Sequence, residues 1–203
     1  MTLPHHPDVT VLSEQTVWSG RFRVDVIQFR HRRFDGALSG VRTWEVFRRG
    51  PAAAVLPYDP VRNRVAIIEQ FRLPALAANL APVMIEIPAG LCDDDEDPAV
   101  TARREVTEET GLALGAMHQV GQFLLTPGGS DEKCTLFMGQ ADLPDRAPSV
   151  SGLAAEMEDI RLRIMDADDA IAQAVAGAYP NSVTAIAMLW LAARRDWLRQ
   201  EWA

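Results

Sequence analysis

The sequence predicts a layered α/β or α+β fold, in which helices pack on a mixed sheet. Several runs alternate apolar and polar residues with period two, which is typical of strands. Three later segments carry the residues that start or stop helices. Turn residues such as Asp-Gly and Pro-Gly separate these runs. Because strand and helix signals are mixed along the chain, the layered class is favoured.

The strands are expected from the N-terminal part onward. Residues 1–15 show no clear pattern and are expected to be a loose start. From Phe22 to Val26 apolar and polar residues alternate, which indicates a strand. Asp35-Gly36 is a hairpin signal, and Val41–Phe47 is the expected returning strand. Further strands are expected at Ala52–Pro57, Val65–Phe71, Met84–Ile87, Val120–Leu125, Thr135–Met138 and Ile160–Met165. The first 48 residues are expected to form a separate strand-rich subdomain or a dimerisation arm.

Three helices are expected, and the first has the clearest boundaries. Asp97 is a good N-cap, Pro98 suits the first helical turn, and Gly111 ends the helix. Asp166–Val175 and Ser182–Leu198 are the other two expected helices. The last of them is apolar along one side and is expected to pack on the sheet.

Composition excludes several classes of protein. The chain has 203 residues and a formal net charge of −8, which disfavours nucleic acid as the main ligand. Its two cysteines, Cys92 and Cys134, form no disulfide framework and no zinc spacing. No apolar segment is long enough to span a bilayer, and residues 1–10 do not form a signal peptide. We therefore expect a cytoplasmic protein that does not act at a membrane.

The first expected helix carries an unusual set of charges. Glu105, Glu108 and Glu109 are spaced so that they lie on one helix face, where like charges repel. Arg104, four residues before Glu108, offsets part of this repulsion, and a hard divalent cation such as Mg²⁺ would offset the rest. The alternative is a solvated acidic face with no function. That alternative suffices for Asp93–Asp95.

The spacing of these residues is more specific than their charge. It matches every position of the Nudix box at Gly90, Glu96, Arg104-Glu105, Glu108-Glu109 and Gly111-Leu112. Outside the box, four more segments resemble bacterial ADP-ribose pyrophosphatases, at residues 49–54, 68–72, 127–132 and 156–161. The resemblance covers nearly the whole chain. It implies a Nudix fold, with a mixed sheet between helices over residues 49–203 and an antiparallel N-terminal subdomain over residues 1–48.

The resemblance also implies a reaction and a metal site. The implied reaction is hydrolysis of the diphosphate of ADP-ribose to AMP and ribose 5-phosphate by a water molecule that Mg²⁺ activates, with Mn²⁺ as a substitute. The implied metal ligands are Glu105, Glu109 and the carbonyl of Ala89. On a loop beyond the box, Glu156 is the implied general base and Glu158 an additional ligand. Before the resemblance is considered, Glu156 is equally well read as an exposed loop acid.

Four further residues, three in the box and one outside it, have candidate roles around that centre. Glu108 and Glu96 are second choices, either as an outer ligand or as a structural partner of Arg104. Arg104 is expected to orient carboxylates rather than to touch the substrate. Arg72 is a candidate clamp on the diphosphate, because a guanidinium can bind two phosphate oxygens at once.

The implied substrate site includes residues from distant segments. The relatives are homodimers in which N-terminal strands reach the partner's site. Pro127 lies sixteen residues after Gly111, as in ADP-ribose-type members of the family. Phe22 is expected either to stack on adenine or to pack in the sheet. The implied substrate-binding residues are Arg21, Phe22, Trp44, Glu45, Arg72, Leu91, Thr126, Pro127, Gly128 and Glu132.

Two competing functions remain at this point. One is a Nudix diphosphatase for another nucleotide sugar, such as GDP-mannose or ADP-glucose. The other is a non-catalytic nucleotide-sugar sensor built on the same fold. The intact acidic cluster argues against the sensor, because a binding-only site need not retain mutually repelling carboxylates.

Overall fold

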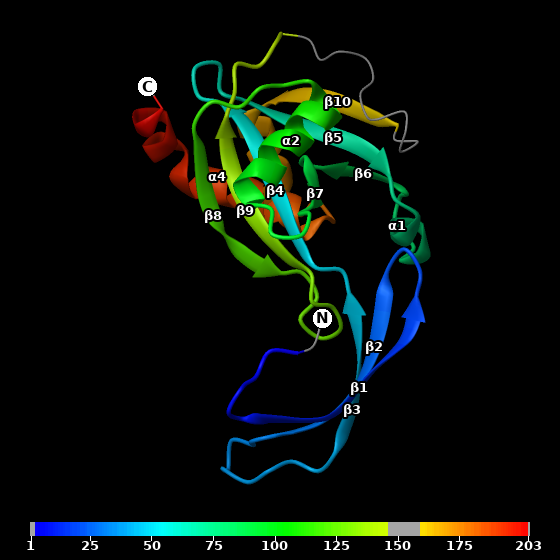
Figure 1. Cartoon of the computed structure of the whole chain (residues 1–203). Helices are drawn as coiled ribbons and strands as arrows, with labels where there is room; N and C mark the ends of the chain where they lie inside the picture. Colours follow the sequence, from blue (N-terminus) through cyan, green and yellow to red (C-terminus); the bar gives the residue numbers. More distant parts are fainter. Residues whose placement is uncertain (1–2, 146–158, 203) are drawn as a thin grey trace. The chain divides into compact units, whose positions relative to one another are not determined.

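The computed structural model describes residues 3–145 and 159–202 (Figure 1). The chain divides into two compact units. The first unit comprises residues 1–50 together with residues 124–132, and the second comprises residues 51–123 and 133–203. The boundary expected after residue 48 stays a prediction, and the assignment of residues 124–132 to the first unit was not expected from the sequence.

The first unit is built on a three-stranded antiparallel sheet in the order β1-β2-β3. Its strands are β1 (Val9–Ser19), β2 (Arg23–His31) and β3 (Arg42–Arg48). The hairpin expected at Asp35-Gly36 lies between β2 and β3, where Gly36 has a φ of 84° and donates its N–H to the carbonyl of Arg33. A positive φ of this kind favours glycine.

The expected loose start at residues 1–15 is wrong, because residues 9–15 belong to strand β1. Nearly every residue of β1 is exposed, so the strand has no alternation of buried and exposed positions to detect. It is held instead by its main-chain pairing with β2, from Val9 opposite His31 to Ser19 opposite Arg23. β-branched residues, which favour strands, make up much of its length.

The second unit contains a seven-stranded mixed sheet, which confirms the predicted fold class. The sheet has the order β10-β5-β4-β9-β8, with β6 paired to β5 and β7 paired to β4. The strands are β4 (Pro51–Asp59), β5 (Arg64–Phe71), β6 (Val83–Glu86), β7 (Ala89–Leu91), β8 (Met117–Leu124), β9 (Lys133–Gln140) and β10 (Ile160–Asp166). β4 and β9 run parallel, whereas the other pairs with a given register run antiparallel. Strand β7 was not expected, because three residues after a proline are too few to show a pattern.

The described residues of this unit also form four helices: α1 (Leu73–Ala77), α2 (Pro98–Thr110), α3 (Ala167–Val175) and α4 (Ser182–Glu201). The short α1 was not expected. Figure 1 draws α2 across one face of the sheet and α4 across the other. Ala102 and Val106 of α2 pack against Ala53 and Val55 of β4 in one core cluster. Within the described residues, no helix combines the length and apolar character that crossing a bilayer requires.

Candidate active site

Helix α2 is fixed at both ends by the residues that the sequence indicates. The Asp97 carboxylate accepts the N–H of Ala99 at 2.9 Å, and Pro98 begins the helix. Gly111 ends it with a φ of 70° and donates its N–H to the carbonyl of Thr107. The caps set where the helix begins and ends, whereas the packing of Ala102 and Val106 in the core sets which face turns inward. Glu109 is buried at 3% exposure. Arg104, Glu105 and Glu108 keep more solvent contact.

Strand β7 lies directly beside these carboxylates. The N–H of Ala89 donates to Oε2 of Glu109 at 3.2 Å. A Cβ placed on Gly90 would stand only 1.9 Å from Oε1 of Glu105. Only glycine therefore allows the Glu105 carboxylate to lie against the backbone. The structure thus brings together Ala89, Gly90, Glu105 and Glu109, which the sequence placed in one site.

Arg104 lies among three carboxylates. Its Nη1 contacts Glu105 at 2.8 Å and Glu108 at 3.0 Å, and its Nη2 lies 3.6 Å from Glu96. Burial opposes the charge of Arg104, but Glu105 and Glu108 outweigh it and raise the pKa of the guanidinium. A second contact, at 3.5 Å, joins Nη2 to the carbonyl of Leu91. Arg104 is thus in contact with the carboxylates that it was expected to orient, and the orienting role itself stays a prediction.

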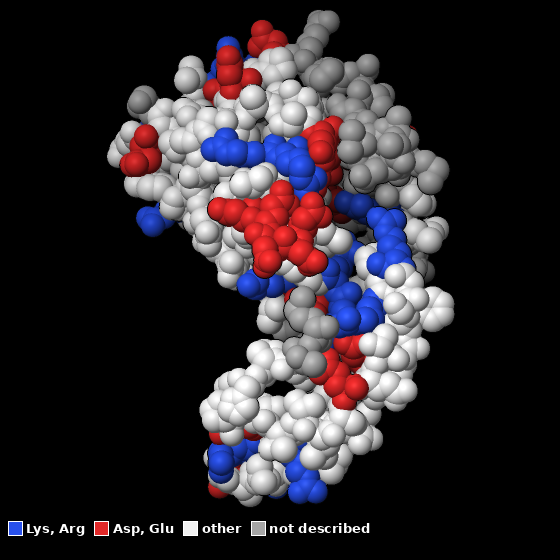
Figure 2. All heavy atoms as spheres, viewed as in Figure 1, with Lys and Arg blue, Asp and Glu red and all other residues white. Residues whose placement is uncertain are grey.

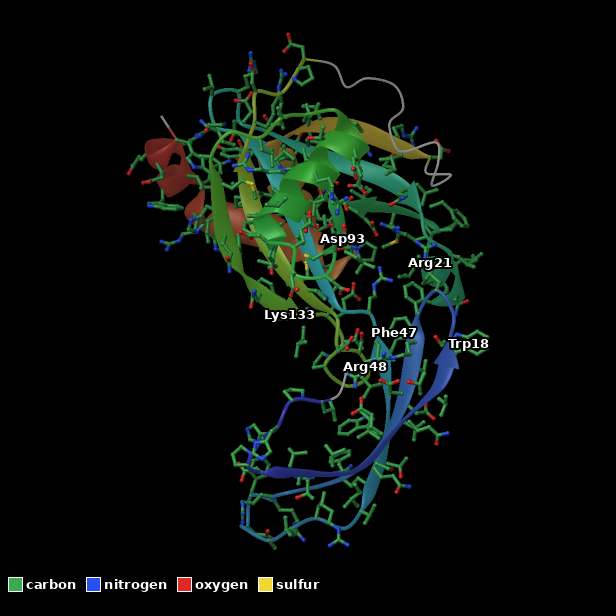
Figure 3. The ribbon with its side chains drawn as sticks, viewed as in Figure 1. Trp18, Arg21, Phe47, Arg48, Asp93 and Lys133 are labelled. Carbon is green, nitrogen blue, oxygen red and sulfur yellow. The ribbon has the colours of Figure 1, made fainter. Side chains whose placement is uncertain are left out.

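Glu96 closes the cluster at the N-terminal end of α2. Its Oε2 accepts hydrogen bonds from the Thr101 hydroxyl at 2.7 Å and from the Asp93 N–H at 3.2 Å. These bonds, the one from Thr101 first, lower the pKa of Glu96. Figure 3 labels Asp93 in the segment before α2, and Figure 2 shows acidic side chains gathered over this area. Asp93 contributes its backbone N–H to this cluster.

The donor chemistry of this cluster fits a hard divalent cation. Carboxylate oxygens beside exposed backbone are the ligands that Mg²⁺ and similar ions prefer. Because Gly90 has no Cβ, the Glu105 carboxylate can lie next to the main chain of β7. Among the described residues, no three Asp, Glu, His or Cys side chains converge as a ready metal site. With Arg104 placed between Glu105 and Glu108, a cation would require these side chains to rearrange.

Arg72 pairs with a different carboxylate. Its Nε and Nη2 donate to Oε2 of Glu86 at 3.1 and 2.8 Å. Glu86 was not singled out from the sequence. An acid inside the apolar run Met84–Ile87 nevertheless indicates a buried charge, and a buried charge needs a partner. Leu91, the other expected substrate contact in this unit, is 41% exposed.

In the first unit, residues 126–129 form a tight turn, as expected for a Pro-Gly-Gly sequence. The N–H groups of Gly129 and Ser130 both donate to the carbonyl of Thr126. The indole N–H of Trp44 donates to the carbonyl of Gly128 at 3.2 Å, and the Trp44 ring stacks on Phe29. Trp44 and Glu45 are adjacent on β3, so their side chains point to opposite faces of the sheet.

Phe22 is surrounded by other side chains of the first unit. Its ring packs on Phe47 at 5.1 Å between centroids, and the Arg49 guanidinium lies 4.9 Å from the ring. Arg21 lies 5.8 Å from the same ring. Arg49 also pairs with Glu132 at 2.8 Å. The structure thus joins Arg21, Phe22 and Glu132 through Arg49, a residue to which the sequence assigned no role, and it shows the packing contacts of Phe22. Figure 3 labels Arg21 and Phe47.

The predicted general base Glu156 and the additional ligand Glu158 lie outside the described residues. Of the two cysteines, Cys134 is buried and Cys92 is half-buried.

The sequence and the acidic helix point to one class of protein. The model of the NUDIX domain matches residues 48–183, so this chain belongs to the Nudix family. Nudix hydrolases generally use divalent metal ions. The Nudix resemblance indicated by the box residues is thereby confirmed.

Within this family, the chain is similar to pyrophosphatases that act on nucleotide sugars and related compounds, as their names state. The chain is 37% identical over 196 residues to the ADP-ribose pyrophosphatase of Escherichia coli strain K12, covering 97% of this chain and 93% of the relative. It is 34% identical over 198 residues to the ADP-ribose pyrophosphatase of Haemophilus influenzae, covering 96% and 91%. A GDP-mannose pyrophosphatase of Cronobacter sakazakii is 35% identical over 151 residues, covering 74% and 78%. The crystal structure of an ADP compounds hydrolase shares the fold, with a TM-score of 0.70 over 98% of both chains at 19% identity.

Proposed function

We propose that this protein is an ADP-ribose diphosphatase, which hydrolyses the diphosphate of ADP-ribose to AMP and ribose 5-phosphate. The observation that carries the proposal is the 37% identity over 97% of the chain to the ADP-ribose pyrophosphatase of Escherichia coli. The similarity to the Haemophilus influenzae protein of the same name, over 96% of the chain, supports it further. The carboxylates of α2 beside Gly90 supply suitable chemistry.

The proposed cofactor is Mg²⁺, with Mn²⁺ as a substitute. Glu105, Glu109 and the carbonyl of Ala89 would hold it, with Glu108 and Glu158 as further ligands. When bound, a divalent cation supplies positive charge beside the diphosphate and lowers the pKa of a water molecule. The position of Glu109 at the Ala89 N–H and of Glu105 against Gly90 supports this assignment.

The side chains of the protein have separate proposed tasks in the reaction. Arg72 binds diphosphate oxygens through its guanidinium. Arg104 orients Glu105 and Glu108. Glu156 accepts the proton of the attacking water. The water oxygen forms a bond to one phosphorus, the bridging P–O bond of that phosphorus breaks, and the other phosphate leaves.

The sugar and base are assigned to residues of the first unit, which we propose act in a homodimer. The proposed contacts are Thr126, Pro127, Gly128, Arg21, Phe22, Trp44, Glu45 and Glu132, with Leu91 from the second unit. Large apolar side chains on β1, including Leu12, Val17 and Trp18, are about half exposed or more, and Figure 3 shows Trp18 pointing away from the sheet. Exposed apolar surface of this kind supports burial against a second copy. Light scattering of the purified protein tests the mass of the assembly.

A second nucleotide sugar is the leading alternative substrate. The 35% identity to the GDP-mannose pyrophosphatase of Cronobacter sakazakii favours GDP-mannose, but it covers only 74% of this chain. ADP-glucose is a further candidate of the same class. The non-catalytic sensor is not favoured, because the complete acidic cluster of α2 is retained. The low number of cysteines, only Cys92 and Cys134, supports the proposed cytoplasmic location, because chains stabilised by disulfides carry more of them.

A substrate panel tests the proposed function. We expect kcat/KM with Mg²⁺ to be highest for ADP-ribose among ADP-ribose, ADP-glucose, GDP-mannose, dinucleotides and dNTPs. Glu109→Gln should lower kcat at least about 100-fold, because an amide no longer supplies the anionic oxygen at the site. Its thermal midpoint should stay near that of the wild type. Comparable rates on every substrate would reduce the proposal to a general diphosphatase, and a near-wild-type rate for Glu109→Gln would remove that residue from the site.

A further inference from the structure

Arg72 is held at its main chain by the residue before β6 and at its side chain by the last residue of β6. Its N–H donates to the carbonyl of Pro82 at 2.7 Å. Its Nε and Nη2 both donate to Oε2 of Glu86, so the planar guanidinium has one fixed orientation. Among the described residues, Glu86 is the ion-pair partner of Arg72. Arg72 itself is 40% exposed at its side chain, whereas Glu86 is 11% exposed.

Glu86 is fixed in turn from its other oxygen. Oε1 of Glu86 accepts a hydrogen bond from the side-chain amide of Asn181 at 3.2 Å. Glu86 stands opposite Ile68 in the β5–β6 pairing, so the sheet also sets the position of its backbone. A carboxylate this buried needs hydrogen bonds on both oxygens to remain charged at low cost.

Asn181 has its own orientation set by helix α4. It is the N-cap of that helix, and its Oδ1 accepts the N–H of Thr184 at 3.0 Å and the Thr184 hydroxyl at 3.2 Å. Because the backbone N–H requires an oxygen acceptor, the amide nitrogen must point toward Glu86. Thr184 is fully buried, which restricts the cap further. A chain of contacts therefore runs from the start of α4 through Asn181 and Glu86 to Arg72.

We propose that Glu86, held by Asn181, is a positioning residue that aims the Arg72 guanidinium at the substrate diphosphate. This inference rests on the proposed function, and it adds two residues to which neither the sequence nor the comparisons assign a role. An arginine has five N–H donors in a rigid fork. Glu86 engages the Nε and Nη2 groups, so the remaining donors are presented outward in a fixed direction. Binding then costs less side-chain ordering than it would for an untethered arginine.

A double-mutant cycle in the full-length enzyme with Mg²⁺ tests this proposal. Arg72→Ala should raise KM for ADP-ribose, and Glu86→Gln should raise KM about 10-fold while kcat falls less than about 3-fold. In the Arg72→Ala background, Glu86→Gln should have no further effect on KM, because its target is absent. A KM increase of equal size in both backgrounds, or a KM decrease for Glu86→Gln alone, would overturn the positioning role.

Asn181→Ser is a second variant that separates positioning from folding. Serine keeps a good N-cap oxygen for α4 but removes the amide donor to Glu86. We expect an unchanged thermal midpoint and a KM increase of about 3-fold that disappears in the Arg72→Ala background. An unchanged KM for Asn181→Ser would overturn the part assigned to Asn181. If Glu86→Gln does not fold, Asn181→Ser alone tests the chain of contacts from Asn181 through Glu86 to Arg72.

Asp168→Asn is the matched control, because it weakens the ion pair of Asp168 with Arg195 on α4 without touching Glu86 or Arg72. Its KM should equal that of the wild type, and a rise would mean that any disturbance of α4 mimics the proposed effect, which would overturn the proposal. If Arg72→Ala leaves KM unchanged, the diphosphate clamp and this inference both fail. The proposed hydrolase activity is judged separately, from the substrate panel and Glu109→Gln.

Discussion

Two arginines of this protein each contact three carboxylates, yet the two clusters are built differently. Arg104 pairs with Glu96, Glu105 and Glu108, which lie on α2 or within one turn before it. The second cluster is centred on Arg48, which Figure 3 labels at the end of β3. Its partners are Glu14 on β1, Asp25 on β2 and Asp131 in the segment 124–132.

The clusters also differ in burial. The Arg48 side chain is 11% exposed and the Asp25 side chain 1%, against 35% for Arg104. Asp25 accepts further bonds from Thr16 and Arg23. Asp131 accepts the N–H groups of Arg49 and Gly50 through its other oxygen.

This difference separates a structural cluster from a candidate catalytic one. The buried Arg48 cluster joins three strands and a distant loop of one unit, so removing a member leaves a charge without its partner. The Arg104 cluster lies on α2 and the turn before it, in contact with solvent, where ion pairs add little stability. Its carboxylates are therefore available to be rearranged around a ligand.

The largest expected effect on stability is in the Arg48 cluster. Asp25→Asn should lower the free energy of unfolding by about 3 kcal/mol, because Arg48 loses its most buried partner. Urea denaturation at neutral pH measures this loss. A change below about 1 kcal/mol would show that the buried cluster contributes no more than a surface pair.

The same cluster predicts a dependence on pH. Burial alone would raise the pKa of Asp25, but bonds from Thr16 and Arg48 and the nearby charge of Arg23 outweigh it and hold the pKa below the ordinary value of 3.8. The stability from this group is thus fully present above pH 3.8 and is lost as the pH falls through the lower, folded-state pKa. The unfolding free energy of the wild type should fall more steeply in that range than that of Asp25→Asn. Parallel curves would contradict this.

Gly90→Ala tests the catalytic cluster through its backbone contact. The added Cβ would overlap Oε1 of Glu105, so the Glu105 side chain must move away from β7. We expect kcat to fall about 10- to 100-fold, as when a metal site loses the support of a ligand. Gly40→Ala is the control, because a Cβ there meets nothing within 4 Å. Full activity in Gly90→Ala would show that the position of Glu105 is not critical.

The smallest expected effect on stability is at Arg104. Arg104→Gln should change the free energy of unfolding by less than about 1 kcal/mol, because its pairs are partly exposed and screened by solvent. Its kcat should nevertheless fall, since Glu105 and Glu108 lose the group that orients them. A loss of stability as large as that of Asp25→Asn, with kcat unchanged, would show that the Arg104 cluster is structural, like the Arg48 cluster.

Much of the candidate site was predictable because its signals are local. The caps Asp97 and Gly111, and the spacing of Glu105, Glu108 and Glu109, all lie within one short helix. A helix has a fixed period, so residue spacing alone decides which side chains share a face. The position of Gly90 beside Glu105 was also indicated, but only through the spacing of a known motif.

The sequence by itself therefore determined the family, the layered fold class and the acidic helix. Only the tertiary structure decided the partners of Arg48, Arg72 and Glu86, and the presence of the exposed strand β1. These features depend on strand register and on contacts between residues far apart in the chain, as when Asn181 at the start of α4 meets Glu86 on β6. The periodicity of a short segment does not predict such contacts, because they form only when the strands and helices pack together.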